Sequence, residues 1–208
     1  MGPQANVEVE ATVRRFTEAG DHDGATTAAL RGYGPEVMRF LCALQKSEAD
    51  ASEVFSVFAE DLWTSMKSFA WGCSLRTWAY TLARRASFRS NRKRRATKLV
   101  LGSSPAISQL VQEVRTQTLT YLRTETKTRL RALRDSLAEE DRALLMLRVD
   151  RGLAWDELAR VLSENDDADP DALKREAARL RKRFQLVKER LKELAKREGI
   201  YPAPGRES

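Results

Sequence analysis

The chain has 208 residues, long enough for one medium domain or two small ones, and its 42% hydrophobic residues suffice for packed cores. It has no run of about 18 apolar residues and no signal-peptide pattern at its N-terminus, so we expect a cytoplasmic protein without a membrane span. The formal net charge of +7 indicates an anionic partner, whereas two cysteines and one histidine are too few for a disulfide framework or a metal site.

The first 68 residues predict a tail followed by two helices. Residues 1–24 are expected to be a loose N-terminal tail with at most one short helix. The first helix is expected to follow a glycine-rich start with Pro35 in its first turn, and its apolar positions are Val37, Phe40, Leu41 and Leu44. Asp50 is expected to cap the second helix, whose apolar face carries Val54, Phe55, Phe58, Leu62 and Met66.

A third helix is predicted from about Leu75, after a loop that spans residues 69–74. Its apolar side carries Leu75, Trp78, Ala79, Leu82 and Ala86, and this spacing favours Trp78 as a core residue. The opposite side is expected to face outward and carries Arg76, Tyr80, Arg84 and Arg85. The helix runs into a basic segment that ends at Arg95.

Residues 96–126 are expected to link two domains, because Gly102-Ser103-Ser104-Pro105 interrupts any helix. Within this linker, residues 107–122 keep some helical periodicity, which is compatible with an ordered connector.

Residues 127–199 predict a second helical domain, followed by a tail at residues 200–208. A helix over residues 155–162, an acidic loop and a long final helix have the order of a helix-turn-helix, whose second helix would enter the major groove. Along the final helix apolar residues recur at alternating spacings of four and three, from Leu173 to Leu194. That seam is also typical of a coiled-coil dimer, so a dimeric regulator remains an alternative.

Charge is distributed unevenly along the chain. Residues 1–61 hold 11 acids and 5 bases, whereas residues 62–112 hold 10 bases and no acid. An acid-free basic stretch beside an acidic one indicates two different partners, with a polyanion at the basic segment. A solvated helix face is the plainer interpretation, and we favour nucleic acid over it.

Aromatic residues lie close to the basic stretch. Phe69, Trp71, Tyr80 and Phe88 precede or interleave with its arginines. Arginine and lysine bind phosphates, and aromatic faces accept unstacked bases, so this combination suits a protein that holds opened DNA. In the final helix, arginine and glutamine are the side chains that make bidentate contacts with guanine and adenine.

Four segments together resemble extracytoplasmic-function sigma factors of the sigma-70 family. Residues 75–84 (LRTWAYTLAR) are similar to the family's promoter-opening segment, and residues 50–63 (DASEVFSVFAEDLW) to the helix that docks on the polymerase clamp. Residues 137–145 (LAEEDRALL) and 152–159 (GLAWDELA) are similar to its C-terminal domain. Arg85 and Arg89 stand where the family has Asn and Asp, and the glutamine usual in the docking helix is replaced near Ser56.

The resemblance implies an all-α protein with two small helical domains joined by the linker. Sigma region 2 at residues 25–95 would recognise and melt the −10 element, through Phe69, Trp71, Ser74, Arg76, Tyr80, Arg84, Arg85, Phe88, Arg89 and Arg92. Sigma region 4 at residues 127–199 would read the −35 element, through Arg179, Arg181, Lys182 and Gln185. The residues implied to bind polymerase are Glu53, Ser56, Val57 and Glu60.

The implied partners are core RNA polymerase, promoter DNA and an anti-sigma factor, with no membrane, small-molecule substrate, metal or cofactor. Three rival functions fit less of the chain. A dimeric helix-turn-helix regulator leaves the basic-aromatic segment without a role, and an RNA-binding protein leaves the helix-turn-helix without one. An enzyme would need paired carboxylates in a pocket, a phosphate loop or a nucleophile motif, and the sequence shows none, so we do not expect catalysis.

Overall fold

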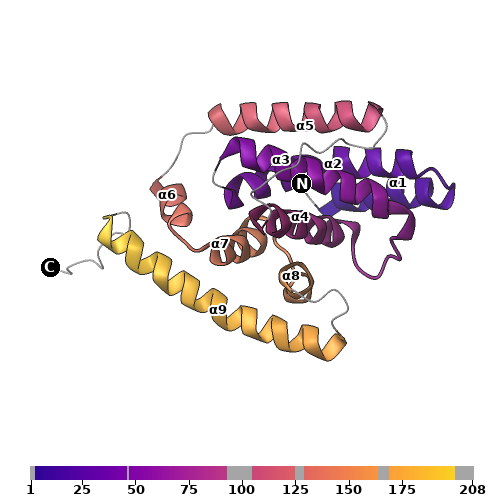
Figure 1. The fold of residues 1–208 in the computed structure, drawn as a ribbon. Helices are drawn as coiled ribbons and strands as arrows, with labels where there is room; N and C mark the ends of the chain where they lie inside the picture. Colours follow the sequence, from indigo (N-terminus) through magenta and orange to yellow (C-terminus); the bar gives the residue numbers. More distant parts are fainter. Residues whose placement is uncertain (1–2, 46, 93–104, 125–128, 164–168, 200–208) are drawn as a thin grey trace. The chain divides into compact units, whose positions relative to one another are not determined.

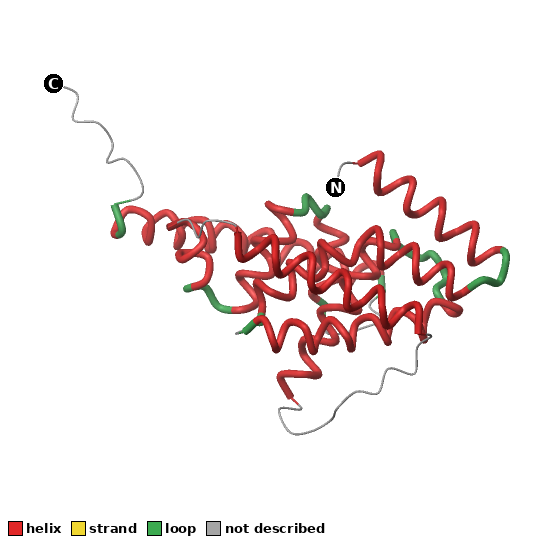
Figure 2. Tube along the Cα trace, turned by 90° about the horizontal axis from the view of Figure 1, so that it is seen from above, coloured by secondary structure: helices red, strands yellow, loops and turns green. Residues whose placement is uncertain are grey.

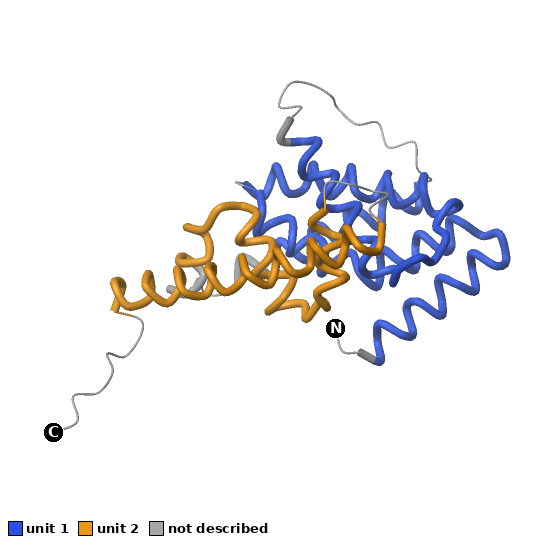
Figure 3. Tube along the Cα trace, turned by 90° about the horizontal axis from the view of Figure 1, so that it is seen from below, with its two compact units in different colours: residues 1–124 blue, residues 125–208 orange. Residues whose placement is uncertain are grey.

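The computed structural model describes residues 3–45, 47–92, 105–124, 129–163 and 169–199, and every regular element in these ranges is a helix (Figures 1 and 2). The chain divides into two units, residues 1–124 and residues 125–208 (Figure 3). The predicted all-α fold in two helical parts is confirmed. None of the helices within the described ranges is long and apolar enough to span a membrane.

Unit 1 is built from five α-helices and one short 3-10 turn in the residues described. They are α1 (Pro3–Glu18), α2 (His22–Leu44), α3 (Glu48–Ser65), the turn Met66–Ser68, α4 (Leu75–Arg92) and α5 (Pro105–Thr124).

Residues 3–18, expected to be a loose tail, form α1, which packs against α2. The two helices approach closely at Gly32, where an added Cβ atom would lie 2.6 Å from Val9 Cγ1. The Tyr33 hydroxyl donates a hydrogen bond to the carbonyl oxygen of Asn6 (3.2 Å), and Val13 is fully buried. Periodicity alone does not predict the full length of α1, because the apolar face of this helix is narrow. The helix is stabilised mainly by its packing against α2.

The starts of α2 and α3 differ from the sequence prediction. α2 begins at His22, where Asp21 accepts a hydrogen bond from the Gly24 amide (2.8 Å), and Pro35 therefore lies inside the helix instead of in its first turn. Ser47, and not Asp50, caps α3, and its hydroxyl accepts a hydrogen bond from the Asp50 amide (3.0 Å). In both cases the cap is the polar residue immediately before the helix, as N-cap geometry requires.

The core of unit 1 forms where α4 packs against both α2 and α3. The ring of Phe40 meets that of Tyr80 edge to face, with centroids 5.4 Å apart, and both side chains are fully buried. Tyr80 was expected on the outer side of its helix, and the structure places it in the core instead. The reason is that α4 has two helical neighbours, so its buried surface is wider than a single apolar stripe.

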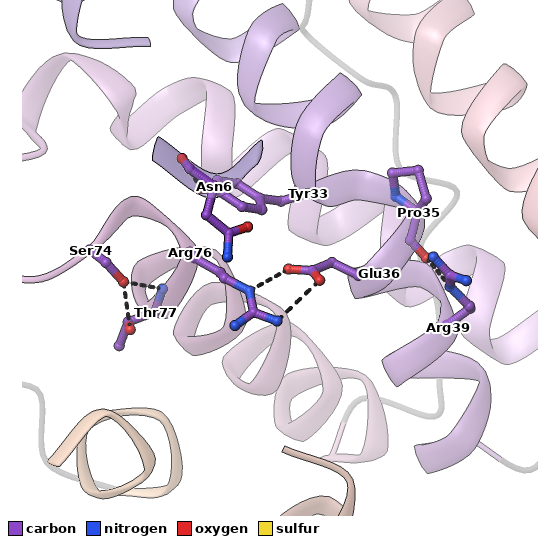
Figure 4. Close-up of polar contacts among 8 residues, drawn as sticks. All are labelled: Asn6, Tyr33, Pro35, Glu36, Arg39, Ser74, Arg76 and Thr77. Atoms are coloured by element: carbon purple, nitrogen blue, oxygen red, sulfur yellow. Dashed lines mark hydrogen bonds and ion pairs between the residues drawn. The ribbon is translucent and has the colours of Figure 1, made fainter. Parts of the chain in front are cut away.

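A buried ion pair ties α2 to the beginning of α4 (Figure 4). Arg76 donates to both carboxylate oxygens of Glu36, at 2.7 and 3.2 Å, and the Glu36 side chain is only 4% exposed. At the same end, Ser74 caps α4 by accepting a hydrogen bond from the Thr77 amide (3.0 Å). The contact between Arg76 and Glu36 is bidentate, which is the strong form of an arginine–carboxylate contact.

Three further polar contacts join the helices of this bundle. Trp63 donates from Nε1 to the Asp23 carboxylate (2.7 Å), and Gln45 donates to the Ser87 hydroxyl (2.7 Å). Asp61 of α3 pairs with Arg89 of α4. Burial raises the pKa of Asp61, and the charge and hydrogen bond of Arg89 offset only part of that rise.

Unit 2 contains, in the residues described, four α-helices and a π-helical turn: α6 (Arg129–Asp135), α7 (Glu139–Leu145), the turn Met146–Asp150, α8 (Trp155–Leu162) and α9 (Pro170–Arg197). α9 packs against α6, α7 and α8. Its start is capped by Asp169, which accepts a hydrogen bond from the Ala172 amide (2.7 Å). Arg183 of α9 pairs with Asp141 (2.6 Å) and Glu140 (2.7 Å) at the start of α7.

Arg76→Met should lower the free energy of unfolding of unit 1 by about 3–5 kcal/mol, because it leaves the Glu36 carboxylate buried without its partner. The double variant Glu36→Leu/Arg76→Met should recover most of that loss. Urea unfolding followed by tryptophan fluorescence in a Trp155→Phe background reports on unit 1 alone, and Lys67→Met at an exposed site serves as the control. Equal losses in the single and the double variant would contradict a role for the ion pair.

Asp61 predicts a pH dependence of stability with a defined sign. Its pKa is raised above 3.8, so the folded state keeps the proton to a higher pH than the unfolded state does. Its stabilising contribution is therefore complete below pH 3.8 and is lost as the pH rises through the folded-state pKa. The unfolding free energy of the wild type, measured relative to Asp61→Asn, should fall as the pH rises from 3.8 through the folded-state pKa. A rise over that range would refute this assignment.

Candidate nucleic-acid interface

The loop between α3 and α4 gathers three aromatic rings. Phe69 stacks on Trp78, with centroids 4.3 Å apart and planes 19° apart, and Trp71 tilts against Phe69 at 4.9 Å. Trp71 and Trp78 are half-buried, so Trp78 is neither a full core residue nor a fully exposed one. The loop thus presents aromatic surface next to the first turn of a basic helix.

Trp71 has a backbone conformation that bulky residues seldom adopt, with φ of 58°. The guanidinium of Arg14, from α1, lies 4.2 Å from the centre of its ring. A bulky residue keeps this backbone conformation only when its neighbours stabilise it. Here the neighbours are the ring of Phe69 and the guanidinium of Arg14. Arg14 was not among the predicted site residues, because it lies in the segment expected to be a tail and no motif marks it.

Two predicted DNA contacts at the start of α4 have structural partners within unit 1. Ser74 caps the helix and also donates from its hydroxyl to the Thr77 hydroxyl (2.8 Å), while Arg76 is bound to Glu36 (Figure 4). These two residues fix the position of the loop relative to α2. The arginine also lies over the buried ring of Tyr80, at 5.7 Å from its centroid.

The second half of α4 carries the remaining basic residues. Arg84 is buried, and its guanidinium lies 3.8 Å from the centroid of Phe88, which is 38% exposed. Arg85 is half-buried, and Arg89 is exposed with one carboxylate partner, Asp61. Arg92 ends the helix, but its side chain and residues 93–104 lie outside the described residues.

The four residues predicted to bind polymerase lie on α3. Glu53 is exposed, whereas Ser56, Val57 and Glu60 are half-buried. The Ser56 hydroxyl donates to the Ser52 carbonyl oxygen (3.1 Å) and accepts a hydrogen bond from Arg115 of α5 (3.4 Å). The structure therefore brings an arginine of the predicted linker onto this surface.

In unit 2 the four residues predicted to read the −35 element all lie on α9 and are exposed: Arg179, Arg181, Lys182 and Gln185. Arg179 is held by two hydrogen bonds to Glu176, both 2.8 Å, which raise the pKa of its guanidinium. Arg179 and Gln185 are six positions apart, and so about 120° apart around the helix. They do not share one narrow face.

α8 and α9 border an open cleft of about 620 Å³ in unit 2. Trp155 lies in its wall, with the guanidinium groups of Arg148 and Arg181 4.7 and 5.6 Å from its ring. Arg160 and Lys174 also line the cleft, and Asp156 is the acid among its lining residues. This concentration of cations suits a phosphate backbone.

The apolar seam of α9 is used within unit 2. Val187 packs with Leu137 and Leu145, and the partly buried Phe184 and Leu191 join this cluster. A coiled-coil dimer would need the same residues on its outer surface. The described seam is therefore explained by the fold of one chain.

No group of histidine, cysteine, aspartate or glutamate within the described ranges is arranged to hold a metal ion.

Comparison with protein families shows that residues 29–97 match the family described as sigma-70 region 2. The matched segment is about a third of the chain and includes most of α2, all of α3 and α4, and the aromatic loop between them. No curated protein and no solved structure matches the chain. The match supports a sigma-70 region 2 at residues 29–97, a domain that suggests promoter recognition and DNA melting.

Proposed function

We propose that the chain is a sigma factor of the extracytoplasmic-function type, which carries core RNA polymerase in the cytoplasm to promoters with −10 and −35 elements. The observation that carries the proposal is the position of the aromatic loop: Phe69, Trp71 and Trp78 lie together at the start of the basic helix α4, inside the segment matched to sigma-70 region 2.

In the proposed mechanism, the loop over residues 69–74 receives a base that leaves the stack as the −10 element opens. A stacked base gains about 1–3 kcal/mol from an aromatic partner, and this offsets the cost of unpairing. Phe88, Arg85 and Arg89 then contact the unwound non-template strand along α4, where phosphates neutralise the arginines. Arg84 acts through Phe88, whose ring it covers.

The pair α8 and α9 is proposed to act as a helix-turn-helix of sigma region 4 at the −35 element. The exposed residues Lys182 and Gln185 lie beyond the first two turns of α9, which end before Ala178. These two side chains are the ones proposed to contact bases. Arg181 and the cations of the neighbouring cleft would contact the DNA backbone, which positions the helix without specifying sequence.

Residues 25–95 are proposed as region 2, residues 96–126 as the linker and residues 127–199 as region 4. An anti-sigma factor is proposed to bind the free protein by covering the surfaces meant for polymerase and DNA. The dimeric regulator receives no support from the seam of α9, because that seam packs against helices of its own unit.

The deciding experiment combines gel filtration of the full chain with sigma-free core RNA polymerase and transcription on sheared genomic DNA of the source organism. We expect a co-eluting complex and transcripts that start at a limited set of sites. Sequence-specific DNA binding by the chain alone, without any core complex, would reject the sigma-factor proposal and leave the dimeric regulator.

Trp71→Ala should reduce promoter opening by about 5- to 150-fold, corresponding to 1–3 kcal/mol of lost stacking, while core binding stays unchanged. Arg14→Ala should have a smaller effect, and the double variant should be less than additive by about 0.5–1 kcal/mol, because the two side chains stabilise each other. Opening is measured with a fluorescent base analogue in the −10 element.

The matched control for Arg14 is its neighbour Arg15, which is also exposed but lies over the ring of Phe16. Arg15→Ala should open promoters as the wild type does. If Arg15→Ala and Arg14→Ala have the same effect, the contact with Trp71 has no part in opening.

A further inference from the structure

α5 covers α2 and α3 in unit 1, although it lies outside the segment matched to sigma-70 region 2 (Figure 1). Its buried positions recur at helical spacing along one face and are Ile107, Leu110, Val111, Val114 and Thr118. Its other face, which includes Gln112, Glu113, Thr116 and Gln117, is exposed. The helix is therefore seated on the bundle by one continuous stripe.

The surface on which this stripe packs is shaped largely by α2. Gly34 offers no side chain under Val114, and an added Cβ atom there would lie only 3.2 Å from Val114 Cγ1. Phe55 of α3 lies beside the same position, 3.6 Å from that Cβ atom. A side chain at position 34 would therefore require Val114 to shift by a few tenths of an ångström.

α5 also reaches the surface that the proposed function assigns to polymerase. Arg115 lies on the edge of the buried stripe and donates from Nη1 to the Ser56 hydroxyl (3.4 Å). Ser56 and its neighbour Val57 are half-buried in the structure. A polymerase helix that docks on this part of α3 meets the space that Arg115 occupies.

One polar group of α5 lacks a hydrogen-bond partner where the helix packs on the bundle. The Nε atom of Arg115 is buried and has no hydrogen-bond acceptor among the described residues. An unsatisfied buried donor costs free energy in the seated state. The apolar stripe and the hydrogen bond to Ser56 therefore hold α5 in place, while the unsatisfied Nε atom of Arg115 opposes it.

We propose that α5 is a built-in competitor of core RNA polymerase: it occupies the face formed by α2 and α3 in the unbound chain and leaves that face when polymerase docks. The inference rests on the proposed function. A competitor on the same chain lowers the affinity for polymerase in proportion to the fraction of time that the face is free. If α5 covers the face about nine-tenths of the time, the face is free about one-tenth of the time and the affinity falls about tenfold.

The first test is amide hydrogen exchange of the full-length wild type, with and without core RNA polymerase. On binding, the amides of α5 should lose protection while those of α3 gain it. Retained protection of α5 in the complex overturns the inference and leaves the proposed function intact. Failure of the wild type to bind core at all overturns both.

The second test compares two variants with the same charge change. Val111→Asp places a carboxylate in the buried stripe, whereas Gln112→Asp places one on the exposed face of the same helix. Val111→Asp should bind core about tenfold more tightly than the wild type, and Gln112→Asp should bind like the wild type. Circular dichroism checks that both variants are folded.

Equal or weaker core binding by a folded Val111→Asp variant means that α5 is a structural part of the domain, and the inference falls. If Val111→Asp does not fold, hydrogen exchange on the wild type decides the matter by itself.

Discussion

The ion pair between Glu36 and Arg76 determines where α4 begins relative to α2, and the proposed DNA-opening site depends on that position. The pair is buried and bidentate, so it fixes both distance and orientation. One residue before α4, Ser74 caps the helix, and four residues before α4, Trp71 takes up its unusual backbone conformation. Tyr33, three residues before Glu36 along α2, connects the same region to α1 through Asn6. The ion pair between Glu36 and Arg76 therefore joins α2 to α4, the helix that begins directly after the aromatic loop.

Much of the fold was predictable because helical periodicity and caps are local. The apolar positions of α3 and the seam of α9 follow from spacing alone, and both faces are packed as that spacing predicts. The position of Tyr80 was not predictable, because the number of helices around α4 is a tertiary property. At most one short helix was expected where α1 lies, and the packing of α1 was not predictable for a similar reason: its contact with α2 depends on Gly32, and a glycine in a sequence usually indicates a break in a helix.

The candidate site was predictable in its residue types but only partly in its contacts. The basic-aromatic composition indicated nucleic acid, and the resemblance indicated which loop holds the aromatic residues. Neither shows that Arg14 lies over Trp71, since 57 positions separate them along the chain. The contact between Arg115 and Ser56 was equally unpredictable from the sequence. The weak periodicity of the predicted linker does not indicate the surface on which this segment packs.

Several arginines on the proposed DNA-binding faces already have carboxylate partners: Arg76 with Glu36, Arg89 with Asp61 and Arg179 with Glu176. A phosphate that binds such an arginine replaces one anion by another, so the electrostatic gain is smaller than the number of basic side chains implies. The net positive charge of the chain thus overstates its attraction for arbitrary duplex DNA. For the proposed sigma factor, this favours an order of events in which the chain binds polymerase first and the complex then searches the chromosome.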